Sequence, residues 1–305
     1  MTKRIGIVGS FVLDKIFPLN GNKIEGIGGL YYSLIISSLL VKDSGSLYPF
    51  AKVGGDFYPK LVKILRKYYN IETEGLIKVF QPNNKVSLYY YSENERREYS
   101  TYVMPYLRYN EFKFLSGFDI FYINFISGRE LKLQTLLKLR KNLYCPFYID
   151  FHSLSLGFRK NGLRYIRPFP NWRKWLKCGD IIQMNEREGR LLFGREFLSD
   201  NDYLLFAKEV LSNGSKVLLL TLGEDGSILF YETGKGIKRV KVPPFFYGSS
   251  KEATGCGDAY AGGFLSEYLR SGDLVNSTIF ASKVAGYKAS LFGSDKLNLF
   301  AKFKG

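Results

Sequence analysis

Short apolar segments without polar alternation recur along this chain of 305 residues, and helix-like segments separate them. The apolar segments that read as buried strands are RIGIVG, YPFAKV, DIFYIN, PFYIDF, DIIQM, KVLLLTL and SILFY. Helical patterns cover about residues 29–41, 56–69, 129–142, 186–193, 202–213, 258–271 and 276–290. Strands that are apolar on both faces and alternate with helices predict an α/β fold, in which helices cover both faces of a mostly parallel sheet. Ligands are then expected beyond the carboxyl ends of the strands.

Two stretches interrupt this alternation and predict a small β element beside the main sheet. Residues 15–27 delay the first helix, and residues 85–104 read as a hairpin with a charged turn. They place strands at about 11–28 and 84–105, either as a lid over a cleft or as an edge extension of the main sheet. No repeat, low-complexity tract or obvious linker divides the chain, so residues 1–305 are expected to form one domain with these insertions.

Composition excludes several classes of protein. Apolar residues make up 46% and charged residues 24% of the chain, which argues against disorder. The longest apolar stretches fall far short of the ~18 residues of a membrane-spanning helix, and the first apolar run is too short for a signal peptide. We therefore expect a soluble, cytoplasmic protein with no membrane partner. Three separated cysteines and a single histidine argue against a structural zinc site or a disulfide framework.

The formal net charge of +16 is compatible with nucleic acid, an anionic surface or a lysine-rich exterior. The densest basic block, residues 158–177, interleaves arginines with Tyr165, Trp172 and Trp175, as nucleic-acid binders often do. No known binding module surrounds it, so a basic surface loop with a short helix is the favoured interpretation. A non-catalytic nucleic-acid-binding protein on this fold is the alternative from another functional class.

The segment EATGCGDAYAGGF, residues 252–264, places glycines at the start of a predicted helix. The unpaired N–H groups and the positive dipole end of such a helix suit an anion. Gly255 and Gly257 let the backbone amides turn inward, and Cys256 between them is small. Asp258 in the first turn can accept a proton from a nucleophile that attacks a bound phosphate. An ordinary loop with Asp258 as helix cap explains the same residues equally well.

Two other nucleotide-binding classes are excluded by spacing. After Gly6 and Gly9 the chain continues with Ser10, Phe11 and Val12, where a dinucleotide-binding dehydrogenase requires the GxGxxG turn. The P-loop pattern GxxxxGK[ST] does not occur in the sequence.

In order and spacing, several segments resemble the ribokinase family, the PfkB-type carbohydrate kinases. The glycine segment resembles the family signature DTxGAGD, and the other matching segments are IGIVGSFVLD, GIGGLYYSLIISSLL, AKVGGDFYPKLVKIL, YIDFHSLSLG, DIIQMNEREGRLLFG and LLLTLGEDGSILF. The resemblance implies a three-layer ribokinase-like sandwich with a small β lid. It also implies a kinase that transfers the γ-phosphoryl group of ATP, with Mg²⁺, to a hydroxyl of a sugar or sugar-like molecule.

The resemblance further implies a role for individual residues. Asp258 would be the general base, and the amides of Thr254, Gly255, Cys256 and Gly257 would form an anion hole. Asn185 and Glu188 would position Mg²⁺ through water, although the same pair can simply cap a helix. The nucleotide pocket would include Thr221, Gly223 and Gly226, of which the glycines also suit a hairpin turn. The implied acceptor-binding residues are Asp14, Gly28, Gly29, Ser33, Asp150 and His152.

Departures from the family pattern leave the acceptor open. Ser33 stands where the family commonly has asparagine, and Pro59 replaces the last glycine of VGxDxxG. A nucleoside could stack on lid tyrosines, and a sugar phosphate could be held by basic side chains; the tyrosines are Tyr89, Tyr90, Tyr91 and Tyr102, and the basic residues are Arg159, Arg164 and Arg167.

Glu252 and Ala253 replace the leading Asp-Thr of the signature. In family members activated by a monovalent cation this region helps to hold the ion, so the resemblance leaves potassium dependence undecided. It also leaves the donor open between ATP, ADP and others. A homodimer through the lid strands is a further expectation drawn from the family.

Overall fold

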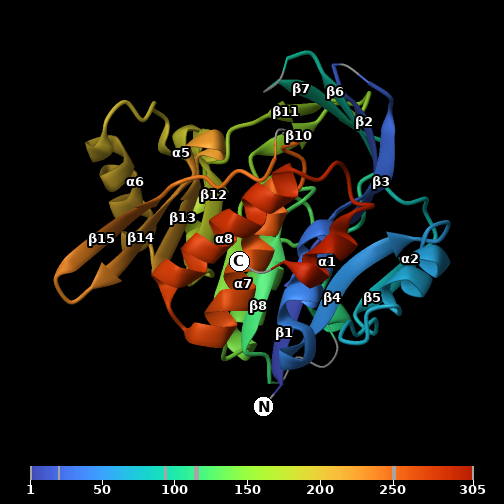
Figure 1. Ribbon diagram of the computed structural model, residues 1–305, viewed down its shortest axis with the longest axis horizontal. Coiled ribbons are helices and arrows are strands. Elements are labelled where there is room, and N and C mark those ends of the chain that lie inside the picture. The colour runs from blue at the N-terminus through green and yellow to red at the C-terminus, as the bar shows by residue number, and fades with distance from the viewer. Residues whose placement is uncertain (1, 20, 93–94, 113–116, 249–251, 304–305) are drawn as a thin grey trace.

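A computed structural model describes residues 2–19, 21–92, 95–112, 117–248 and 252–303 (Figure 1). The strands are β1 Lys3–Val8, β2 Phe11–Phe17, β3 Ile24–Gly29, β4 Gly45–Gly54, β5 Leu76–Val79, β6 Lys85–Tyr90, β7 Arg96–Ser100, β8 Ile120–Asn124, β9 Phe147–Asp150, β10 Leu156–Phe158, β11 Arg164–Ile166, β12 Ile181–Asn185, β13 Val217–Thr221, β14 Ser227–Thr233 and β15 Gly236–Val242. The α-helices are α1 Leu30–Val41, α2 Tyr58–Leu65, α3 Leu133–Asn142, α4 Trp172–Leu176, α5 Glu186–Phe193, α6 Asp200–Ser212, α7 Cys256–Ser271 and α8 Leu274–Ala289. Short 3₁₀ helices are η1 Lys42–Ser44, η2 Tyr109–Glu111, η3 Gly223–Asp225 and η4 Leu297–Lys302. None of the helices within these ranges has the length and apolarity needed to span a membrane.

The largest sheet in the described part of the chain has nine strands in the order β15-β14-β13-β12-β9-β8-β1-β4-β5. From β13 to β5 every neighbouring pair is parallel, whereas β14 and β15 extend one edge as antiparallel strands. The prediction of a mostly parallel sheet is therefore confirmed. The carboxyl ends of β8, β9 and β12 lie side by side, because these strands are parallel neighbours.

Helices cover both faces of this sheet. Alternate residues of one strand enter two different cores, as Ile5 and Ile7 of β1 do on one side and Val8 does on the other. The first core is closed by α1, α2, α7 and α8, and the second by α3, α4 and α6. In Figure 1, α7 and α8 lie in front of the sheet. The predicted three-layer α/β class is confirmed by this arrangement.

A separate four-stranded sheet, in the order β3-β2-β6-β7, projects from the end of the main sheet (Figure 1). It joins the two stretches that interrupt the strand and helix alternation, because β2 pairs with β6 in parallel over Leu13–Phe17 and Lys85–Tyr89. A small apolar core between these strands includes Val12, Ile16 and Leu88. That this sheet acts as a lid stays a prediction, as does a homodimer formed through it.

Several helices differ from their predicted bounds at the ends. The second helix spans Tyr58–Leu65 instead of 56–69, and Pro59 lies in its first turn, where proline is tolerated. The third begins at Leu133 instead of 129, because the Glu130 carboxylate accepts N–H groups from Ser127 and Arg129 in a preceding turn.

The basic block over residues 158–177 contains the expected short helix, α4, and both of its tryptophans belong to the core, whereas Tyr165 is 41% exposed. Trp172 and Trp175 are 3% and 8% exposed and pack with the residues of α6 and the sheet. Their rings are therefore not available to stack on nucleic-acid bases.

Candidate functional site

The glycine loop leads directly into α7, as the sequence predicts. Gly255 is the N-cap residue and has φ +79°, a left-handed conformation that favours glycine. A Cβ atom on Gly255 would lie 2.8 Å from the Tyr32 ring, so the position also lacks space for a side chain. The loop therefore owes its path to both the backbone conformation and the packing of α1 against it.

The amides of this loop are only partly free. Thr254 N donates to Glu252 Oε1 at 2.7 Å, and Cys256 N donates to the Ala253 carbonyl at 3.2 Å. Within the described part of the chain, the amides of Gly255 and Gly257 have no hydrogen-bond partner. Two of the four amides predicted to bind an anion are thus already paired within the loop, and anion binding by the amides of Gly255 and Gly257 stays a prediction.

Asp258 lies in the first turn of α7, half-buried, with its carboxylate held by another strand. Asn124 Nδ2, at the carboxyl end of β8, donates to Asp258 Oδ1 at 2.5 Å. Burial raises the pKa of Asp258 to about 7, although the Asn124 hydrogen bond and the charge of Lys288 act in the opposite direction. A carboxylate with a pKa near neutrality is suited to general-base catalysis.

Sequence reasoning missed Asn124 and Gln183. Gln183 lies in β12, and its Nε2 donates both to Asp150 Oδ2 at 3.1 Å and to the Gly257 carbonyl at 3.0 Å. Asn124 is fully buried, and its Oδ1 has no partner among the described residues. Asn124 is the polar residue that ends β8, and Gln183 is a buried polar residue within the apolar start of β12, and these are the signals that could have identified them.

Asp14 lies in β2 of the smaller sheet and is 7% exposed. Burial, with a contribution from Glu98, raises the pKa of Asp14 to about 8, and Asp258 also contributes. The backbone of Gly28 in β3 closely approaches this side chain, because a Cβ atom on Gly28 would lie 1.7 Å from Asp14 Oδ2. The two predicted acceptor residues are thus in contact with each other.

One tyrosine of the four-stranded sheet, Tyr90, contacts the glycine loop. The Tyr90 hydroxyl lies 3.2 Å from Thr254 Oγ1, and Arg96 Nη1 donates to the same Tyr90 hydroxyl at 2.6 Å. Tyr89 instead stacks on Phe17, with ring centroids 4.5 Å apart. One predicted lid tyrosine therefore lies at the site, and Arg96 is a cationic side chain there that sequence reasoning did not identify.

Asn185 and Glu188 form a capping box at the start of α5. Asn185 Oδ1 accepts from Glu188 N, and the Glu188 carboxylate accepts from both Asn185 N and Asn185 Nδ2, at 2.7 to 2.9 Å. Burial raises the pKa of Glu188 to about 8. Burial also raises the pKa of Asp150, and the nearby charge of Glu188 adds to that effect. Asn185 and Glu188 therefore form the helix cap that was the alternative to a magnesium site. A cation bound nearby would favour the ionised forms of Glu188 and Asp150.

The residues predicted to line a nucleotide pocket lie together at the end of β13. Thr221 is half-buried, and Gly223 and Gly226 occupy the turn that joins β13 to the antiparallel β14. The hairpin-turn alternative for the glycines is correct as a description of their place in the chain. A nucleotide contact by the same turn stays a prediction.

Two further predicted acceptor residues differ in accessibility. Ser33 is fully buried in α1 and donates to the Leu30 carbonyl at 3.3 Å, and a contact of its side chain with the acceptor stays a prediction. Gly29 is the N-cap residue of the same helix.

His152 is exposed, has φ +26°, and donates its N–H to Asp150 Oδ1 at 3.2 Å. Such a backbone conformation is uncommon outside glycine and is often found at functional sites. Desolvation lowers the pKa of His152, and the charges of Arg164 and Arg96 lower it further.

The arginines considered for a sugar phosphate are largely used within the protein. Arg164 contacts Glu98 at 3.3 Å and donates to the Ser127 carbonyl at 3.2 Å. Arg167 donates to the carbonyls of Leu154 and Leu156. Arg159 is exposed and lies over the Tyr165 ring. These contacts do not favour a phosphate site built from Arg164 and Arg167.

Cys256 is not an activated thiol. Its Sγ lies 3.3 Å from the Glu252 carbonyl, and burial raises the pKa of Cys256 to about 12. A helix N-terminus tends to lower the pKa of a thiol, but at Cys256 desolvation is the larger effect. Cys256 acts as the small filler that the sequence also suggested.

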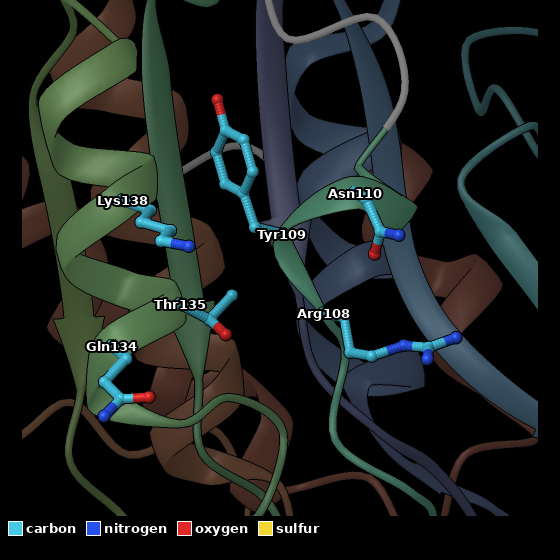
Figure 2. A pocket seen from close by; sticks show the side chains of 6 residues that line it. All are labelled: Arg108, Tyr109, Asn110, Gln134, Thr135 and Lys138. Carbon is cyan, nitrogen blue, oxygen red and sulfur yellow. The ribbon is translucent and has the colours of Figure 1, made fainter.

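A pocket of about 300 Å³ lies elsewhere, between η2 and α3 (Figure 2). Its lining residues are Arg108, Tyr109, Asn110, Gln134, Thr135 and Lys138. None of the residues predicted for the functional site lines it.

Comparisons with known proteins agree with the fold and with the family that the sequence resembles. A family model described as pfkB family carbohydrate kinase matches residues 45–298. The deoxyribokinase of Salmonella typhi is 24% identical over 287 residues, which cover 88% of this chain and 87% of that protein. An ATP-dependent 6-phosphofructokinase of Thermoanaerobacterium thermosaccharolyticum is 26% identical over 145 residues, which cover 48% of this chain and 40% of that relative.

Solved structures extend this likeness to nearly the whole chain. A sulfate complex of a pyrophosphate-dependent kinase in the ribokinase family has a TM-score of 0.79 at 20% identity, covering 96% of this chain and 98% of that chain. Arabidopsis thaliana ribokinase, complexed with ribose and ATP, has a TM-score of 0.74 at 16% identity and covers 100% of both chains. At these identities the likeness shows the ribokinase fold.

Proposed function

Because the chain belongs to the pfkB family of carbohydrate kinases, whose members transfer phosphoryl groups to hydroxyls, we propose that it phosphorylates a sugar or sugar-like acceptor with ATP as donor. The observation that carries this proposal is the position of Asp258. It lies at the start of α7, directly after the free amide of Gly257, and Asn124 holds its carboxylate. A base and an anion-binding helix terminus are thus adjacent.

Asp258 accepts the proton of the acceptor hydroxyl as its oxygen attacks the γ-phosphorus. The bond from this phosphorus to the oxygen that bridges it to the β-phosphorus breaks, and ADP leaves with that oxygen. The amides of Gly255 and Gly257 donate to the phosphoryl oxygens, whose negative charge must be stabilised during transfer. Asp14 and Asp150 bind acceptor hydroxyls, and His152 is a further candidate for such a contact.

The residues present fit a magnesium ion held mainly by the donor. No group of three His, Cys, Asp or Glu side chains that could hold a metal occurs within the described ranges. Magnesium commonly keeps several waters and binds through substrate phosphates with one or two carboxylates. Glu188 and Asn185 would hold it through water, and when bound it neutralises phosphate charge. Thr221, Gly223, Gly226 and Thr254 would contact the nucleotide.

The first experiment is a test of phosphoryl transfer with a matrix of donors and acceptors. ATP, ADP and pyrophosphate are each combined with sugars, sugar phosphates and nucleosides, and the phosphorylated product is detected by mass spectrometry. We expect product only with a small hydroxyl-bearing acceptor and with ATP. Product from nucleosides alone would favour the alternative nucleoside kinase, and salt-sensitive binding to unrelated DNA or RNA without any product would favour the non-catalytic alternative.

The pH dependence of kcat tests the base directly. Because Asp258 must be ionised to accept a proton and has a pKa of about 7, kcat is expected to rise with pH through about 7 and to level off above it. The Asn124 hydrogen bond lowers the pKa of Asp258, so Asn124→Leu should move this acid limb to higher pH. Asn142→Leu, at the exposed end of α3, is the matched control and should leave the limb in place. An acid limb that Asn124→Leu does not move would contradict the contact.

A further inference from the structure

Lys288 of α8 is a fully buried cation beneath the glycine loop. Its side chain is 0% exposed, and its Nζ donates to Glu252 Oε2 and to the Leu291 carbonyl, each at 2.9 Å. The same ammonium lies 5.3 Å from the centre of the Tyr32 ring. Removing an ammonium from water costs several kcal/mol unless its partners compensate. A carboxylate oxygen, a carbonyl oxygen and an aromatic face are partners that do so.

Two of these partners also touch the glycine loop. Glu252 uses its other oxygen, Oε1, to accept the Thr254 amide at 2.7 Å, and its own amide donates to the Ala289 carbonyl of α8 at 2.9 Å. The Tyr32 ring lies against Gly255, the N-cap residue of α7. Lys288 therefore holds both the start of the loop and the ring that supports its turn.

We propose that the Lys288 ammonium is a built-in monovalent cation, which holds the glycine loop in the conformation that phosphoryl transfer requires and makes the enzyme independent of added potassium. The inference rests on the proposed kinase function and assigns Lys288 as a positioning residue. It also accounts for Glu252, which replaces the first residue of the family signature and here serves as the counter-ion of an internal charge.

The charge of Lys288 reaches the reacting groups as well. It lowers the pKa of Asp258 and of Cys256, against the effect of burial. The other titratable or charged groups around this region are Glu252 of the loop, Tyr32 of α1, Asp14 of β2, Asp150 of β9 and Arg96 of β7. Arg96 approaches the loop from the smaller sheet through Tyr90, whereas the Lys288 ammonium is fully buried behind the loop and contacts Glu252 directly.

The test compares the wild-type protein with Lys288 variants at constant ionic strength in potassium, sodium or tetramethylammonium chloride. Wild-type kcat is expected to be equal in the three salts. Lys288→Met keeps the side-chain length but removes the charge, and should lower kcat by about 100-fold, as loss of a preorganised anion-stabilising group does. It should also move the acid limb of kcat to higher pH. Lys283→Met, on the partly exposed face of the same helix, is the matched control and should change neither.

A second variant separates positioning by charge from ordinary ion pairing. Lys288→Met alone leaves Glu252 buried without its partner and can weaken folding, whereas Glu252→Gln with Lys288→Met removes both charges. If the pair were only structural, the double variant would regain wild-type kcat. We expect the double variant to fold, as measured by circular dichroism. Its kcat should stay below that of wild type, and the rise of kcat with pH should still lie at higher pH than in wild type.

Lys288→Ala supplies a readout besides activity. It leaves a space beside Glu252 and Leu291, so potassium or ammonium should raise the thermal midpoint of this variant relative to tetramethylammonium, and should not do so for wild type. Activation of the wild-type enzyme by potassium over tetramethylammonium, or full kcat in the double variant, would overturn the inference while leaving the kinase assignment intact. If wild type phosphorylates no acceptor, the proposed function fails, and the thermal comparison still tests the cation.

Discussion

Replacing Asp258 by asparagine is expected to lower kcat by about 10²–10⁴-fold, the usual contribution of a general base. Asparagine has nearly the same shape, so the loop and the start of α7 should keep their conformation. KM for donor and acceptor should change little, because the lost interaction belongs to the transition state. Steady-state kinetics with the acceptor identified in the donor and acceptor screen measure the effect. Asp295→Asn, at an exposed position, is the matched control. An undiminished kcat in Asp258→Asn would refute the assignment of the base.

The same variant should be more stable than wild type at neutral pH. The folded-state pKa of Asp258 is about 7, well above its ordinary value of 3.8. Between these two pH values the folded state holds more protons than the unfolded state, so stability falls as pH rises through this window. Asparagine removes that dependence. Urea unfolding at pH 4 and pH 8 should therefore show a gain for Asp258→Asn at pH 8 that is small at pH 4. Loss of activity together with a gain in stability would distinguish a catalytic role from misfolding.

Gly28→Ala is expected to raise KM for the acceptor by about 100-fold, comparable to the cost of leaving a buried polar group without its hydrogen bond. The added Cβ would lie 1.7 Å from Oδ2 and 2.4 Å from Cγ of Asp14, so the carboxylate must move. Since Asp14 is buried, it has little room to do so without displacing β2 from β3. KM for the donor should be unaffected, because the residues proposed to contact the donor are Thr221, Gly223, Gly226 and Thr254.

Gly26→Ala in the same strand is the matched control. Its Cβ would meet Ser294 Oγ at 2.7 Å, which is the end of a side chain that can rotate. We expect kinetics close to wild type for Gly26→Ala and a raised acceptor KM for Gly28→Ala. Equal kinetics in both variants would exclude Asp14 from acceptor binding.

Much of the architecture could be predicted because it depends on local patterns. Apolar strands that alternate with helices predict a mostly parallel sheet with helices on both faces. The structure has this sheet, with an apolar core on each of its faces. The two interrupting stretches also pair as expected, as β2 with β6. The glycine loop before α7 follows from Gly255, whose left-handed conformation other residues resist.

Residues brought together from distant segments could not be predicted in this way. Asn124 and Asp258 are 134 positions apart, and Glu252 and Lys288 are 36 apart, so no short pattern records either contact. Lys288 reads in the sequence as one more surface lysine among 44 basic residues. Its burial beneath the loop depends on how α8 packs against α7.

The sequence by itself determined the strands, the helices and the position of Asp258 in the first turn of α7, because backbone conformation and apolar periodicity are local properties. Only the tertiary structure decided which loop amides are free, which side chain holds Asp258 and which charge lies behind the loop. Those features depend on burial and on hydrogen bonds between elements, and both arise only when the layers pack.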